Sequence, residues 1–109
     1  MLNINGLSWR VLLVSANHPS LMREDGTWSI GACDNVLRTI YVCDEIEQNE
    51  LKKVLAHELT HAAMFSYNIM LNWQQEEMLA DLIATYGQEI VYKTNIFFKH
   101  IKENREALC

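Results

Sequence analysis

Two histidines and a glutamate in the segment His57-Glu58-Leu59-Thr60-His61 have the types and the spacing of a zinc hydrolase site. On an α-helix, residues i and i+4 point to one face and lie about 6 Å apart along the axis. The two imidazoles can therefore bind one metal ion, since neutral imidazole nitrogen is a common zinc ligand. Glu58 flanks the same face and can hold a water that the metal polarises. The motif predicts His57 and His61 as metal ligands and Glu58 as the general base.

The motif lies in a segment that has the pattern of an amphipathic helix. Asn49 can cap this helix, and apolar residues then recur at spacings of three and four, at Leu51, Leu55, Leu59, Ala62 and Phe65. Leu55 and Leu59 define a buried stripe in this pattern. We therefore expect the motif to lie beside the core and to face a cleft between this helix and a sheet.

A catalytic zinc ion takes three protein ligands and a water, so the two histidines need a partner. A second helix, expected from Gln74 onward, carries Glu77 and Asp81 on one face, and the small Ala80 beside them permits close helix approach. We assign Glu77 as the third ligand. Asp81 would accept the other ring N–H of a ligating histidine. Glu76, about 100° around the helix from Glu77, is the alternative ligand.

The residues before the motif helix have the composition of strands. Ser8 to Ala16 predicts a buried strand, and Thr27 to Cys33 and Leu37 to Cys43 predict two more, paired as a hairpin. The long second helix has a candidate interruption at Gly87, and whether 94–106 continues it or forms a third helix is left open. The order predicts an α+β fold of three strands (β-β-β) followed by two or three helices, in a single domain over residues 1–109.

Composition narrows the function class. Nine basic and fourteen acidic residues give a net charge of -5, which disfavours a nucleic-acid binder. No apolar run approaches the roughly 20 residues that cross a membrane, and no secretory signal is visible. The cysteines are odd in number and lack a C-x-x-C pair, which favours reduced thiols. We expect a cytoplasmic protein with no nucleic-acid or membrane partner.

The motif and what surrounds it resemble the gluzincin metallopeptidases. His57-Glu58-Leu59-Thr60-His61-Ala62 is followed by Glu77-x-x-x-Asp81, and the pattern is similar to small phage-associated and ImmA/IrrE-like members. In those, a strand with a Gly-x-x-Asp element, here Gly31-Ala32-Cys33-Asp34, precedes an apolar strand, here Ile40-Tyr41-Val42, and then the motif helix. The resemblance spans residues 28 to 84. It implies a minimal zincin-like fold, Zn²⁺ as the cofactor, the ligands and base assigned above, and a peptide or protein substrate.

Two departures from the resemblance concern the cleft. His61 and Glu77 are sixteen residues apart, a shorter spacing than in thermolysin-like enzymes, and no subdomain follows to form a far wall. A small, open cleft is therefore implied. No motif identifies the group that would stabilise the oxyanion, for which Tyr86, Tyr92 and His100 are candidates.

Other hypotheses stay open beside the peptidase. The zinc site could be structural, in a phage or prophage regulatory protein without general proteolytic activity, or the chain could be a metal-free interaction protein that self-associates through its C-terminal helix. A thiol at Cys109 could reach the zinc ion and block its open position. Aromatic side chains are expected in the core or in an interface rather than at a substrate site, and these are Trp9, Trp28, Trp73, Phe97 and Phe98.

Overall fold

The computed structural model describes residues 1–108, with the backbone alone for 106–108, and has an α+β architecture. Four strands form one mixed sheet in the order β1-β2-β4-β3. Their bounds are Leu2–Ile4 for β1, Leu7–Val14 for β2, Gly31–Asp34 for β3 and Thr39–Cys43 for β4. The central strands β2 and β4 are parallel, and the edge strands β1 and β3 are each antiparallel to their neighbour.

The sheet has four strands, so the expectation of three was wrong. The additional strand β1 pairs with β2 through a hairpin at Asn5 and Gly6, whose φ angles are 49° and 82°. These positive angles are what a two-residue hairpin turn requires, and Asn-Gly is the sequence that adopts them most readily. The signal was therefore present in the sequence.

The second expected strand begins later than the predicted Thr27. The side chain of Asp25 accepts hydrogen bonds from the backbone N and the Oγ1 of Thr27, at 2.9 and 2.6 Å, and Gly26 has a φ of 85°. These contacts hold a turn, so β3 starts only at Gly31. The expected hairpin between β3 and β4 is present, with Asp34 opposite Thr39.

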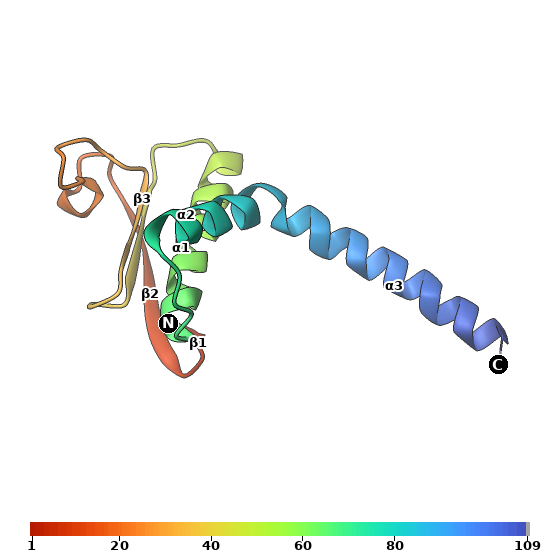
Figure 1. The fold of residues 1–109 in the computed structure, drawn as a ribbon. Helices are drawn as coiled ribbons and strands as arrows, with labels where there is room; N and C mark the ends of the chain where they lie inside the picture. Colours follow the sequence, from red (N-terminus) through yellow and green to blue (C-terminus); the bar gives the residue numbers. More distant parts are fainter. Residues whose placement is uncertain (109) are drawn as a thin grey trace.

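Helix α1 (Gln48–Ser66) covers one face of the sheet, chiefly over β3 and β4 (Figure 1). Its N-cap is Glu47, not the expected Asn49, because the Glu47 carboxylate accepts a hydrogen bond from the Asn49 backbone N–H. The core beneath α1 is small. Its fully buried cluster comprises Trp9, Ile40, Val42 and Ala62, and Leu55 and Leu59 pack against it from the expected stripe.

The chain then turns back beside α1. Asn72 and Gln75 form a capping box at the start of α2 (Trp73–Leu82), which satisfies two backbone N–H groups that would otherwise lack partners. A π-helical segment, η2 (Ile83–Gly87), separates α2 from α3 (Gln88–Leu108), at the place where an interruption was expected. Residues 94–106 belong to α3, which extends away from the other elements (Figure 1). Among the described residues, no helix is long and apolar enough to cross a membrane.

Candidate metal centre

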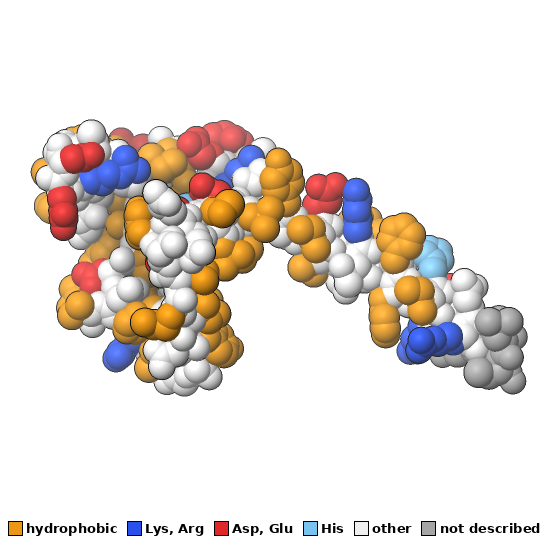
Figure 2. Space-filling view, viewed as in Figure 1, with side chains coloured by type: hydrophobic (Ala, Val, Ile, Leu, Met, Phe, Trp, Pro, Cys, Tyr) orange, Lys and Arg blue, Asp and Glu red, His pale blue; other side chains and the backbone are white. Residues whose placement is uncertain are grey.

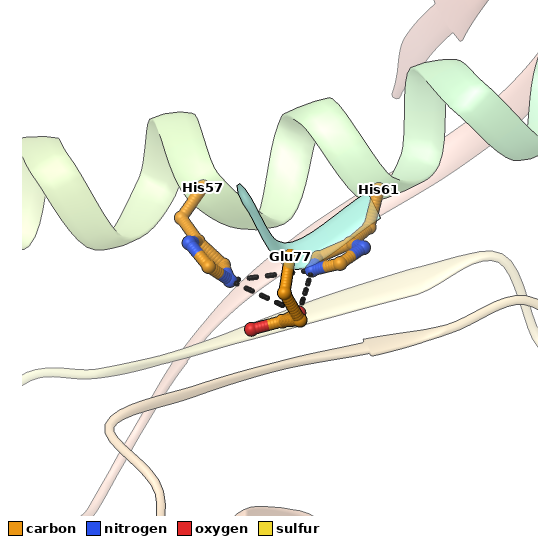
Figure 3. Close-up of side chains that lie close together, drawn as sticks. All are labelled: His57, His61 and Glu77. Atoms are coloured by element: carbon orange, nitrogen blue, oxygen red, sulfur yellow. Dashed lines mark hydrogen bonds and ion pairs between the residues drawn. The ribbon is translucent and has the colours of Figure 1, made fainter. Parts of the chain in front are cut away.

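Three donor atoms from α1 and α2 converge at one point (Figure 3). The Nε2 atoms of His57 and His61 lie 3.2 Å apart. Oε1 of Glu77 lies 2.6 Å from Nε2 of His61 and 3.5 Å from Nε2 of His57. The structure therefore brings together the three residues that the sequence suggested as ligands, in a group that could bind a metal ion.

The two helices position these side chains by different means. Spacing i,i+4 within α1 aligns the two imidazoles, because a helix turns by about 400° over four residues. Glu77 comes from the second turn of α2, which packs against α1 where Ala80 is fully buried. An alanine at this contact lets the two backbones approach closely, so that a glutamate side chain one turn away can reach both histidines.

Carboxylates also contact the outer nitrogen of each imidazole. Oδ1 of Asp81 lies 3.0 Å from Nδ1 of His57, the contact that we expected for this aspartate. Oε1 of Glu76 lies 3.5 Å from Nδ1 of His61. Glu76 therefore lies beside the outer nitrogen of His61, not at the point of convergence, and its place there was missed because helical spacing alone does not distinguish neighbouring carboxylates.

The donor set fits zinc on chemical grounds. Carboxylates at Nδ1 favour the tautomer with Nδ1 protonated, which leaves both Nε2 lone pairs pointing toward each other and toward the Glu77 carboxylate. Three electron-rich atoms at this separation repel one another unless a proton or a metal cation lies between them. Ligands of a tetrahedral zinc ion with bonds of about 2.0–2.1 Å are separated by roughly 3.3 Å, close to two of the three distances here. The remaining contact, between His61 and Glu77, is shorter and would have to open by about 0.7 Å.

Glu58 lies beside the donor set and is only 7% exposed. Burial, with a further contribution from the Glu77 carboxylate, raises the pKa of Glu58 to about 7, although His57 acts in the opposite direction. Strand β3 contributes to this burial, because a Cβ added at Gly31 would lie 3.0 Å from Oε2 of Glu58 and 2.5 Å from Cγ1 of Val54. A glycine is therefore needed where the edge strand approaches α1.

An open cleft runs across the donor set. On one side it has a volume of about 270 Å³ and is bounded by Leu21, Cys33 and Trp73, and on the other a volume of about 410 Å³ bounded by Ile30, Val54 and Thr85. The two parts are continuous, because both are lined by Arg23, Gly31, His57, Glu58 and Glu77. Burial raises the pKa of the Cys33 thiol to about 12, which keeps it protonated and a poor metal ligand.

Trp73 was expected in the core or an interface, and the structure does not place it in the core. Its side chain is 68% exposed and lines the cleft. Its ring stacks on the His61 imidazole, with centroids 5.9 Å apart and planes 10° from parallel. Trp73 therefore forms one wall of the site, where the start of α2 meets α1.

The candidates for oxyanion stabilisation are not brought to the cleft. Tyr86 lies in η2, and Tyr92 and His100 lie on α3, which leads away from the donor set (Figure 1). The hypothesis that Cys109 blocks the metal concerns a residue outside those that the structure describes.

A family model described as "Predicted Zn-dependent protease (DUF2268)" matches residues 1–87 of the chain, which include the whole sheet, α1, α2 and η2. No curated protein and no solved structure matches.

Proposed function

Because the chain belongs to the family described as Predicted Zn-dependent protease (DUF2268), we propose that it hydrolyses peptide bonds, with zinc held by His57, His61 and Glu77. One observation carries the proposal: two Nε2 atoms and a carboxylate oxygen from two helices lie within 4.8 Å of one another. A carboxylate outside the donor set lies beside Nδ1 of each imidazole. This arrangement is the one expected of a metal ligand set, since outer carboxylates orient ligating histidines.

Glu58 is the proposed general base. When bound by such residues, zinc lowers the pKa of a coordinated water to about 7 and polarises a carbonyl group. The Glu58 carboxylate would accept a proton from the attacking water and deliver it to the leaving amine. Before zinc binds, burial raises the pKa of this carboxyl to about 7, close to the ambient pH at which a group that must both accept and donate a proton works best.

The substrate would be an extended peptide segment that lies along β3. In the described part of the chain, β3 pairs with β4 alone, and its residues Gly31, Ala32 and Cys33 line the cleft. An unpaired strand edge offers N–H and C=O groups to a peptide, which can add as a further strand. Such pairing would carry the peptide backbone past Glu58, since Gly31 lies against that side chain.

Within zinc peptidases, we place the chain with the gluzincins. The reason is the third donor, a glutamate on the helix that follows the motif, at a contact of 2.6 Å with His61. Replacing Glu77 with glutamine should weaken zinc binding more than replacing Glu76 with glutamine. The opposite order would make Glu76 the ligand.

The test combines zinc content with peptide cleavage. Purified wild-type protein is expected to hold one zinc ion per chain by elemental analysis and to cleave members of a library of internally quenched decapeptides. Glu58→Gln should keep the zinc and lose cleavage, whereas His57→Ala should lose both. Glu103→Gln and His100→Ala, both on α3, are matched controls expected to retain both properties.

Two results would contradict the proposal. Full cleavage by Glu58→Gln would show that Glu58 is not the base. Stoichiometric zinc without cleavage of any library member, or of denatured protein, would favour the alternative function, a structural or regulatory zinc protein without general proteolytic activity.

A further inference from the structure

Helix α3 carries an apolar surface that no described element covers. The 21-residue helix extends beyond the rest of the molecule, and hydrophobic side chains gather along it (Figures 1 and 2). Six large apolar side chains on η2 and α3, here called the α3 stripe, are each between 53% and 64% exposed. They are Tyr86, Ile90, Val91, Phe97, Phe98 and Ile101.

The α3 stripe occupies one side of the helix. Successive residues turn by about 100°, so Ile90, Phe97 and Ile101 lie within about 40° of one another. Val91 and Phe98 flank them together on one side. Lys99 and Glu103 point away from the stripe, as does the exposed Tyr92. The opposite side is mixed, because it carries Ile96 as well as Tyr92, Lys99 and Glu103, whereas a continuous apolar face like the stripe is typical of a helix that packs against a partner.

The helix has little else to stabilise it. Within the described structure, α3 contacts chiefly η2, at its own N-terminal end. Most of the stability of a protein helix comes from packing of its apolar face against other elements. A contiguous exposed apolar surface such as the α3 stripe is also an aggregation risk unless a partner covers it.

We propose that α3 pairs in antiparallel orientation with α3 of a second copy of this chain. The spacing along the α3 stripe is symmetric, because Tyr86, Ile90, Phe97 and Ile101 are separated by four, seven and four residues. Reversing the helix therefore places Tyr86 opposite Ile101 and Ile90 opposite Phe97. In the same register, the flanking residues Val91 and Phe98 of the two copies lie on one side of the helix pair, offset from each other by two residues, about 3 Å, along the axis. Every large side chain of the stripe finds an apolar partner around a two-fold axis, as an isologous dimer requires.

The area of the stripe is sufficient for a stable dimer. Side chains of these types that are about half exposed present roughly 100–150 Å² each, so the six contribute about 700 Å² per copy. Two copies would bury about 1,400 Å², within the range of about 1,200–2,000 Å² found for stable interfaces. The antiparallel orientation also separates the two sheet-bearing parts, since each lies at the N-terminal end of its own α3 (Figure 1).

Mass measurement with a matched pair of variants tests the dimer independently of zinc and of cleavage. Light scattering of the full chain at about 100 µM should give twice the chain mass of 12.7 kDa. Phe97→Glu should raise the dimer dissociation constant by at least about 100-fold, because it places two like charges inside an apolar contact. Tyr92→Glu changes an aromatic residue of similar exposure, 66%, on the opposite side of α3, and should leave the dimer unchanged.

Cross-linking tests the orientation. In a Cys109→Ser background, Thr94→Cys lies next to the two-fold axis and should form an intermolecular disulfide on mild oxidation. Ile90→Cys should not, because in the antiparallel register its equivalent lies about 10 Å away along the axis. Equal cross-linking of Ile90→Cys would overturn the antiparallel arrangement. A monomer at about 100 µM would overturn the dimer. If that monomer bound phosphatidylglycerol vesicles through α3, the partner would be a membrane surface instead.

Discussion

Replacing Glu58 with glutamine is expected to stabilise the metal-free protein by about 3 kcal/mol above pH 7. The side chain is 7% exposed, and its burial, together with the Glu77 carboxylate, raises its pKa from 4.5 to about 7. Each pKa unit corresponds to about 1.4 kcal/mol of difference between the two protonation states. The pKa rise multiplied by this energy means that ionised Glu58 destabilises the folded chain by about 3 kcal/mol. A neutral amide of the same shape removes this cost.

The sign of the effect sets its pH dependence. Between about pH 4.5 and pH 7 the folded state binds more protons at Glu58 than the unfolded state does. The free energy of unfolding of the wild-type chain should therefore fall as the pH rises through this window and become constant above it. The difference between Glu58→Gln and wild type should be near zero below pH 4.5 and largest above pH 7.

Urea unfolding in the presence of EDTA, followed by tryptophan fluorescence at pH 4.5, 6 and 8, measures this difference. Glu103→Gln, an exposed glutamate on α3, is the control and should track the wild type at each pH. If Glu58→Gln were no more stable than wild type at pH 8, or if its advantage did not grow with pH, ionisation of buried Glu58 would not cost the folded chain stability. A gain in stability on loss of the proposed base would also show that this buried carboxylate is kept at a cost to folding.

Three further predictions concern the supports of the site. Asp81→Asn should weaken zinc binding about 10-fold, measured in competition with a chelator. This is the lower end of the range of about 10- to 100-fold for such supporting residues, because Asp81 is 71% exposed. An unchanged affinity would show that the contact of Asp81 with His57 does not orient the ligand. Gly31→Ala should lower the free energy of unfolding by about 1–3 kcal/mol in urea titrations, because the Cβ of the alanine would lie 2.5 Å from Cγ1 of Val54. A stability equal to that of wild type would mean that β3 can move away from α1 without cost. Asn72→Ala removes the capping box of α2 and should cost about 1 kcal/mol, whereas Asn72→Asp, which can still cap, should cost less; equal losses would exclude the capping explanation.

Much of the fold could be predicted from local patterns. The α+β class, the β3–β4 hairpin and the helical segments followed from periodicity and turn residues, which act over a few positions. Strand β1 was missed although Asn5 and Gly6 encode its turn, because a three-residue strand carries too little alternation to stand out. The parallel pairing of β2 with β4 could not be predicted in the same way, since it joins strands separated by a long connection that contains η1 and β3.

The candidate ligands also differ in whether local geometry or tertiary packing determines their direction. The alignment of His57 with His61 is a property of helix geometry, so the spacing of the motif determined it before any tertiary contact was known. Glu76 and Glu77 are neighbours in the chain and differ by about 100° around α2, so the direction that each side chain takes depends on how α2 crosses α1. The structure directs Glu77 to the convergence point and Glu76 to Nδ1 of His61.

The sequence by itself determined the types of the donor atoms and their places along two helices, because those depend on short-range geometry alone. Only the tertiary structure decided the environment of the donors: the approach of β3 at Gly31, the burial of Glu58 and the exposed Trp73 stacked on His61. The physical reason is that desolvation and contact depend on which elements pack together, and residues far apart in the chain supply them. The same holds for α3: the spacing of its apolar residues can be recognised in the sequence, but only the fold shows that no other element among the described residues packs on them.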